Sequence, residues 1–101
     1  MSAAPVGYTR EDMARPPEKF MRAEPVYEGA ADDEYLMGVL EELAAREGWA
    51  EAVERAGGIP TETPPEVTRE ANPHYGRPGP DGEPDPVKLF IVSRGWAIRR
   101  A

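Results

Sequence analysis

The 101-residue chain contains no cysteine and a single histidine, His74. Without cysteine it has neither a disulfide framework nor a thiolate ligand for a metal, a composition that fits a reducing compartment. Large apolar side chains are also scarce, because Leu, Ile, Val and Phe together make up 16 of the 101 residues. A share below about 20%, combined with a high net charge, is typical of chains that do not fold by themselves. The composition therefore favours a small domain that is held in place by a partner.

Long apolar runs and excess positive charge are missing as well. No stretch approaches the ~18 apolar residues of a membrane span, and the N-terminus lacks the apolar core of a signal peptide. The formal net charge is −7. Nucleic acids and anionic membranes attract cationic proteins, so this charge argues against both as partners. We expect a cytoplasmic protein that binds neither nucleic acid nor membrane.

The charge is unevenly distributed along the chain. Residues 28–56 carry a net charge of −7, whereas residues 87–101 contain four basic residues and no acid. Either the basic tail folds back on the acidic segment of its own chain, or it lies on an acidic surface of a partner. The first arrangement needs no second protein and is the simpler one.

One stretch, residues 32–58, is strongly patterned. Asp32 or Asp33 can cap the start of a helix by accepting a hydrogen bond from a free backbone N–H group. Two apolar sets follow, each spaced as one face of a helix: Leu36, Val39, Leu40 and Leu43, and then Trp49, Ala52, Val53 and Ala56. On one straight helix these sets would be rotated by about 140° from each other, and Gly48 lies between them. The pattern predicts two helices, 33–47 and 49–56, with Gly57 and Gly58 ending the second.

Proline and glycine, 12 and 10 residues respectively, shape much of the remaining chain. Residues 1–31 are predicted to be an extended arm with short helical turns, one of them beginning at Pro17. Residues 59–86 are predicted to hold a short helix, capped by Thr63 and ending near Ala71, and then a Pro/Gly-rich loop. Residues 87–101 complete the chain as a strand and a basic tail. The predicted fold is mainly α, with a small two-helix centre, long extended Pro-rich arms and one C-terminal β-strand.

Residues 87–92 form the only segment with the β-branched and aromatic content of a buried strand. Trp96, Ala97 and Ile98 either extend this strand or form another. A lone strand leaves its backbone hydrogen-bonding groups unsatisfied, and no other segment matches it in quality. The sequence therefore favours addition of this strand to a sheet of another subunit. The alternative is pairing with the N-terminal arm of the same chain.

No catalytic or metal-binding pattern is present. His74 is a weak candidate for a general acid or base, because no serine, threonine or acidic residue is spaced to form a relay with it. Metal binding would depend on carboxylates alone, and the acidic loop of residues 81–85 lacks the spacing of a calcium-binding loop. The glycines do not follow a strand and open a helix, so no phosphate-binding motif is met. We expect no metal and no cofactor.

These features predict a non-catalytic accessory or small subunit. It would wrap and stabilise a larger protein subunit in a heteromeric complex, such as a multisubunit enzyme. Scattered aromatic side chains are the expected contacts with that partner, because aromatic residues are enriched at binding hot spots; they are Tyr8, Phe20, Tyr27, Trp49, Tyr75, Phe90 and Trp96. One alternative is a free-standing regulatory or adaptor protein that binds a partner transiently, and another is a small enzyme that uses His74.

Overall fold

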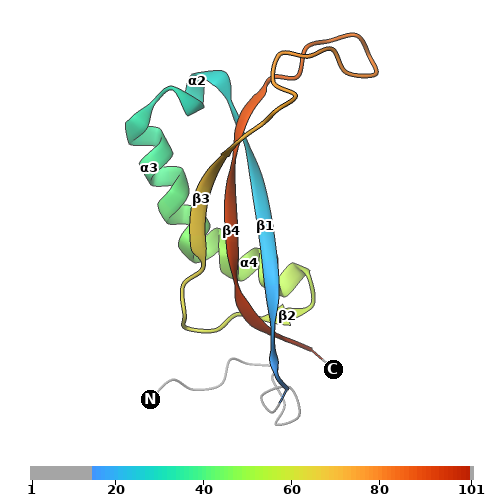
Figure 1. The fold of residues 1–101 in the computed structure, drawn as a ribbon. Coiled ribbons are helices and arrows are strands. Elements are labelled where there is room, and N and C mark those ends of the chain that lie inside the picture. The colour runs from blue at the N-terminus through green and yellow to red at the C-terminus, as the bar shows by residue number, and fades with distance from the viewer. Residues whose placement is uncertain (1–14, 101) are drawn as a thin grey trace.

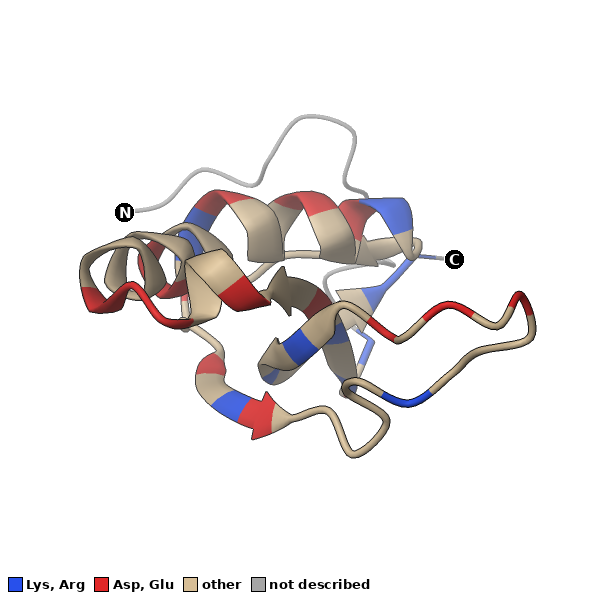
Figure 2. Ribbon diagram, turned by 90° about the horizontal axis from the view of Figure 1, so that it is seen from above, with Lys and Arg blue, Asp and Glu red and all other residues tan. Residues whose placement is uncertain are grey.

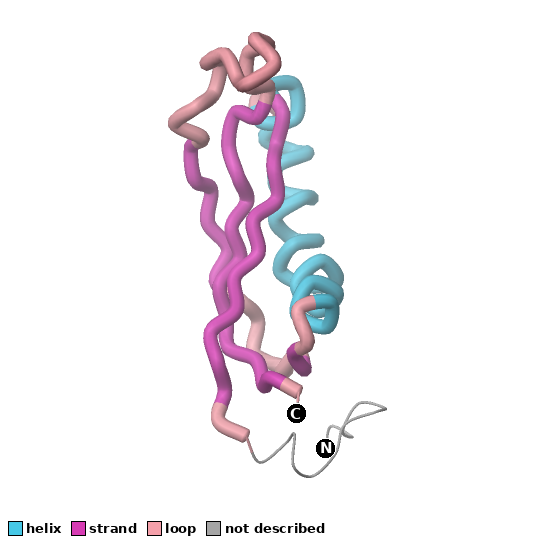
Figure 3. Tube along the Cα trace, turned by 90° about the vertical axis from the view of Figure 1, so that its right-hand side faces the viewer, coloured by secondary structure: helices cyan, strands magenta, loops and turns pink. Residues whose placement is uncertain are grey.

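A computed structural model describes residues 15–100, which form one antiparallel sheet with a helical layer on one of its faces (Figures 1 and 3). The four strands of this part of the chain are β1 (Pro17–Tyr27), β2 (Gly58–Ile59), β3 (Glu66–Ala71) and β4 (Val87–Arg99). The prediction of a mainly α protein with a single strand is therefore wrong. The sheet is the larger part of the fold, and the helical layer packs against it.

Strand β4 is the centre of the sheet. It pairs with β1 from Pro17↔Ile98 to Tyr27↔Val87, and its other side pairs with β3 along one half and with β2 near its end. The strand that was predicted to lack a partner in its own chain thus pairs with three other strands of that chain. The alternative, pairing with the N-terminal arm, is the arrangement found. Ser93 and Gly95 do not interrupt β4, which continues through Trp96 to Arg99.

Strand β1 was mistaken for a helical turn because Pro17 suits the first position of a helix. The alternation of side chains in fact decides the structure: Phe20 and Val26 are buried on the helix-covered face, and the residues between them alternate across the sheet. Pro25 has no backbone N–H group to donate to a neighbouring strand. In the described residues β1 is an edge strand, where the missing N–H group of proline is tolerated.

The helix predicted to start at Thr63 is also wrong. Residues Glu66–Ala71 form β3, which pairs with β4 in unbroken register from Glu66↔Arg94 to Ala71↔Leu89. The capping pattern of Thr63 and Glu66 is a local signal. The ladder with β4 satisfies the backbone of the whole segment, and this outweighs a single capping interaction.

The helical layer consists of α2 (Glu28–Ala31), α3 (Glu34–Leu43), a π-helical turn at Ala44–Gly48 and α4 (Trp49–Arg55). The last three elements form one continuous 22-residue helix rather than the predicted two. Its ends were predicted correctly. Asp33 caps the start by accepting a hydrogen bond from the Leu36 backbone N–H at 3.1 Å, and Gly57 follows the end with a positive φ of 84°.

The π turn determines which side of α3 faces the sheet together with α4. A π turn inserts a residue into the helix, and one residue corresponds to about 100° of rotation. On a regular helix Trp49 and Val53 would lie about 150° around the axis from Met37 and Ala44, and the inserted residue reduces this angle to about 50°. As a result Met37 and Ala44 before or within the turn, and Trp49 and Val53 after it, are all buried against the sheet.

The core is small and contains glycines at its closest contacts. One cluster joins Phe20, Trp49, Val53 and Ala97, and a second joins Val26, Met37, Ala44 and Ile91. The indole of Trp49 lies on Gly95, where an added Cβ would be 2.8 Å from Cζ2 of the ring. Gly58 is in the same situation beneath Phe20 and Val53, with both contacts at 2.8 Å. These glycines let aromatic side chains approach the backbone.

Residues 72–86 form a finger that projects beyond the end of the sheet (Figure 1). Its base is closed by Asn72, whose side-chain amide donates to the Asp85 carboxylate at 3.0 Å and to the Val87 carbonyl at 2.8 Å. The backbone N–H of Val87 donates to Asp85 at 2.9 Å, and together with Asn72 it lowers the pKa of Asp85. The Tyr75 hydroxyl donates to Glu28, which raises the pKa of Tyr75 and holds the finger against α2.

We expect Gly95→Ala to destabilise the fold by about 1–3 kcal/mol, because the new methyl group would overlap the Trp49 ring. Gly38→Ala is the matched control. Gly38 lies on the exposed side of α3 with no atom within 4 Å of an added Cβ, so alanine there should stabilise the helix by about 0.5–1 kcal/mol. Urea unfolding of both variants measures the difference. Equal stability of Gly95→Ala and the wild type would contradict the packing of Trp49 on β4.

Candidate interaction surface

The helices cover only one face of the sheet, and the opposite face is open in the described structure (Figure 3). Side chains alternate between the two faces along each strand. The open face therefore receives Met21 and Ala23 from β1, together with Phe90, Val92 and Trp96 from β4. The register places Ala23 directly beside Val92. This face is largely apolar at its centre.

A hollow of about 250 Å³ lies in the open face. Val92 is buried within it, while Met21 and Phe90 stand beside it. Met21 is 66% exposed although it lies next to the apolar centre of the sheet. A depression floored and walled by apolar side chains accepts an apolar group better than a charged one.

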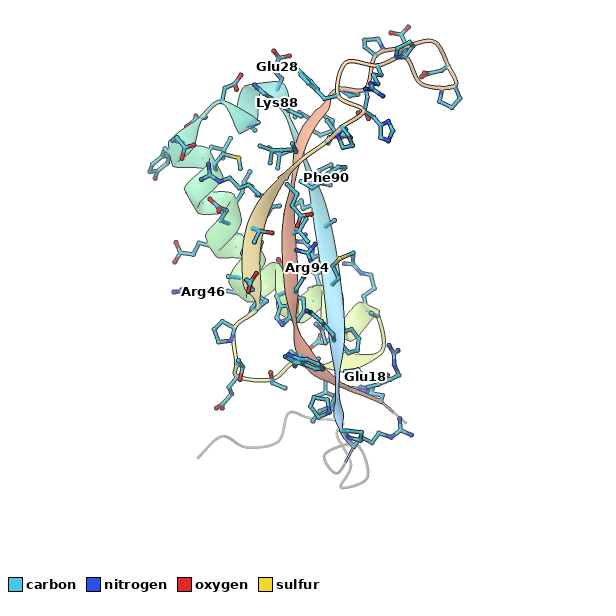
Figure 4. All side chains as sticks on the ribbon, in the orientation of Figure 1. Glu18, Glu28, Arg46, Lys88, Phe90 and Arg94 are labelled. Atoms are coloured by element: carbon cyan, nitrogen blue, oxygen red, sulfur yellow. The ribbon has the colours of Figure 1, made fainter. Side chains whose placement is uncertain are left out.

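One ion pair borders this hollow. Arg94 donates to the Glu70 carboxylate at 2.7 Å, and the Thr68 hydroxyl donates to the same carboxylate at 3.1 Å. Arg94 first and Thr68 second therefore lower the pKa of Glu70, and Glu70 raises the pKa of Arg94. Figure 4 shows Phe90 and Arg94 on β4 between the neighbouring strands. The pair fixes the polar border of an otherwise apolar depression.

Trp96 stands at the other end of the open face and is 56% exposed. Its cross-strand neighbour is Lys19, and its carbonyl accepts a hydrogen bond from the Thr61 hydroxyl at 3.2 Å. The backbone of Trp96 is thus fixed while its indole faces outward. An exposed tryptophan on a fixed strand loses little conformational entropy when it is covered by a partner.

A second apolar surface lies on α3. The buried line of this helix is Met37, Leu40 and Ala44, whereas Leu36, Val39 and Leu43 are partly exposed. The predicted apolar face of α3 is thus mostly an outward stripe, and of its four members only Leu40 packs with the core. The π turn is the reason, because it aligns the Met37 line with α4. We call Leu36, Val39 and Leu43 the α3 stripe.

Arg69 fixes the orientation of α3. Its guanidinium group donates to Glu34 at 2.7 Å and to Glu41 at 2.6 Å, which joins β3 to the helix. The same contacts lower the pKa of Glu34, chiefly through the hydrogen bond from Arg69. Glu34 and Glu41 therefore mark the side of α3 that faces β3.

Basic residues lie along β4, and acidic residues are spaced along the helical layer (Figure 2). Arg99 donates to Glu18 of β1 at 2.6 Å and lies 5.1 Å from the centre of the Phe20 ring. Lys88 contacts Asp32, just before α3, at 2.6 Å. The basic segment thus folds on its own chain, as the simpler of the two expectations had it: Lys88 meets the acidic segment 28–56 at Asp32, and Arg99 donates to the Ala56 carbonyl at 3.4 Å.

The structure places the predicted contact residues in different environments. Phe20 and Trp49 are buried in the core, where they touch residues of their own chain. Tyr8 lies outside the described residues. The side chains that reach the surface are Tyr27, Tyr75, Phe90 and Trp96. Met21 is exposed as well, and its exposure follows from the alternation of side chains along β1.

His74 lies in the finger, apart from Ser93 in the sheet. It lies in the finger beyond Ala71, which pairs with Leu89, whereas Ser93 is four residues further along β4, or about 13 Å. Ser93 is fully buried, and its hydroxyl has no hydrogen-bond partner in the described structure. These two residues do not form a relay. Within residues 15–100 no three His, Asp or Glu side chains gather as a metal site.

Comparisons of the chain with protein-family models, with curated proteins and with solved structures find no match. None of the described helices is long and apolar enough to cross a bilayer.

We expect Glu70 to titrate below its ordinary pKa of 4.5. A carboxylate with a lowered folded-state pKa stabilises the fold above its unfolded pKa, and this contribution is lost as the pH falls through the folded value. Glu70→Gln should therefore be less stable than the wild type at neutral pH, with a difference that shrinks in acid. NMR titration of the carboxyl carbon should show a larger rise of the pKa in Arg94→Met than in Thr68→Val. An unchanged pKa in Arg94→Met would contradict the ion pair.

Proposed function

We propose that this protein is a non-catalytic small subunit that docks on a larger protein through the open face of its sheet. The observation that carries the proposal is the combination of Trp96, Met21 and the hollow above Val92 on a face that the described chain leaves uncovered. Soluble domains normally bury the apolar face of a sheet against a second layer. Here a partner would supply that layer.

The chemistry of the face defines the partner. The centre is apolar, and Arg94 and Glu70 already neutralise each other at its border. A complementary surface therefore needs one apolar side chain for the 250 Å³ hollow and a flat apolar area for Trp96. In protein interfaces most of the binding energy comes from a few anchor side chains, which are surrounded by a polar rim.

The alternative role, a free-standing adaptor that binds transiently, is favoured by a different observation. The chain has two buried clusters of its own, and β4 is paired on both sides by its own strands. The sequence favoured an obligate subunit because residues 87–92 were predicted to form an unpaired strand, but β4 is paired on both sides. A domain with these features can fold before it meets a partner and bind reversibly.

Thermal unfolding of the purified chain distinguishes the two roles. A single cooperative transition, followed by circular dichroism, is expected if the internal pairing of β4 and the two clusters suffice for folding. This result would favour reversible binding. A chain without a cooperative transition would favour an obligate subunit that folds only on its partner.

Trp96→Ala should reduce recovery of the partner at least about tenfold when the tagged full-length chain is isolated from the cells that make it, because an anchor lost from a hot spot costs about 2 kcal/mol. Quantitative mass spectrometry measures the recovery. Tyr35→Ala is the matched control, because Tyr35 is 84% exposed on α3 and is not part of the open face. Loss of the partner in Tyr35→Ala and not in Trp96→Ala would place the docking surface elsewhere.

Fluorescence gives an independent measurement on the complex. Trp49 is buried and Trp96 is exposed, so acrylamide should quench mainly Trp96 in the isolated chain. Binding of the recovered partner should protect Trp96 and leave Trp49 unchanged. Quenching that is identical with and without the partner would contradict docking on the open face.

A further inference from the structure

Strand β1 has one unpaired side along its whole length in the described structure (Figure 1). A proline within a ladder directs its nitrogen away from the neighbouring strand, because it has no hydrogen to donate. Pro25 pairs with Phe90, so its nitrogen faces the free edge. By alternation, the free backbone N–H and C=O groups belong to the odd-numbered residues, and Ala23 lies at the centre of them.

The sequence of β1 is complementary to itself around Ala23. In an antiparallel pair of two β1 strands centred on this residue, Arg22 of each copy is opposite Glu24 of the other. In the same register Phe20 is opposite Val26, and Met21 is opposite Pro25. Opposite charges and apolar pairs at facing positions stabilise a sheet. The missing N–H group of Pro25 removes one hydrogen bond from each of two symmetric pairs, and the others can form.

We propose that β1 is the interface of a symmetric homodimer, in which two copies join edge to edge around Ala23 into one continuous sheet. Such an interface uses the same surface on both copies. Each copy then supplies a strand that pairs with the free edge of its partner.

Neighbouring registers are unfavourable for reasons of charge. Because only odd-numbered residues present their backbone groups to the edge, the centre can move only in steps that keep odd residues opposite odd residues. Centring on residue 22 places Arg22 opposite its own copy, and centring on residue 24 does the same with Glu24. Like charges directly opposite each other destabilise a sheet. The Ala23-centred register avoids both conflicts and replaces the present Arg22–Glu24 pair, 3.2 Å within one chain, by two pairs between chains.

The helical layer does not cover the middle of the β1 edge completely. A hollow of about 480 Å³ lies between α4 and β1, lined by residues 22–25 and by Ala52, Arg55 and Ala56. The residues around the proposed dyad are therefore accessible.

The α3 stripe also faces this side. Glu34 and Glu41, which contact Arg69 on β3, lie about 75° around α3 from the buried line of Met37, Leu40 and Ala44. The α3 stripe lies about 100° from that line in the opposite direction. Because β1 and β3 flank β4 on opposite sides, the stripe is directed toward the β1 side.

Sedimentation equilibrium of the full-length chain should show a dimer at micromolar concentration. Arg22→Glu should weaken dimerisation at least about tenfold, because two attractive cross-strand pairs become repulsive. The double variant Arg22→Glu/Glu24→Arg should restore it, since the opposite charges face each other again. Arg46→Glu makes the same change in net charge on the exposed side of the helix and should leave the dimer intact. Circular dichroism shows which variants are folded.

A cysteine cross-link tests the register. The chain has no cysteine of its own, so Ala23→Cys introduces a single thiol. Opposite residues in a hydrogen-bonded antiparallel pair have Cα atoms about 5.5 Å apart, within the range of a disulfide. Mild oxidation should therefore give a disulfide-linked dimer for Ala23→Cys and much less for Met21→Cys or Thr68→Cys.

A monomer at all accessible concentrations would overturn the proposal. So would a dimer that forms equally well in Arg22→Glu, or one that cross-links through Thr68→Cys and not through Ala23→Cys. These measurements need no heterologous partner. Their failure is therefore independent of the docking proposed for the open face.

Discussion

The hydrogen-bonded ladders on both sides of β4 are the constraint on which the rest of this structure depends. Val87–Arg99 pairs with β1 along one side and with β3 and β2 along the other. Backbone pairing on this scale does not require large side chains, because each residue contributes the same donor and acceptor. This explains how a chain with few large aliphatic residues holds an ordered sheet, and why segments with weak strand signals become strands beside β4.

The contact between the helical layer and the sheet also uses few large side chains. Gly58 and Gly95 bring Phe20, Val53 and Trp49 against the backbone, where a few aromatic and aliphatic groups fill the interior. The π turn then aligns two apolar lines that a regular helix would separate. The result is a core that covers one face of the sheet and one line of the helix. The open face and the α3 stripe are what this small core leaves uncovered.

The two proposed interactions use different parts of this exposed surface. The open face offers the apolar hollow beside Phe90 and the indole of Trp96, a chemistry that suits a different protein. The β1 edge offers backbone groups and a self-complementary order of charges, a chemistry that suits a second copy. Joining two copies at β1 would place two open faces side by side. A larger partner would then meet a continuous surface instead of two separate ones.

Signals that act within a few residues were predicted from the sequence: a cap of the helix at Asp32 or Asp33, the end of the helix at Gly57 and the core of β4. Among the candidate contact residues, Trp96 is exposed on the open face, whereas Phe20 and Trp49 are buried in the core. Strands β1 and β3, and the side of α3 that is buried, were not predictable in this way. Their conformations depend on pairing with β4 and on packing against the sheet, which involve residues far apart in the chain. Local propensity determined where elements could begin and end, and only long-range contact decided what they became.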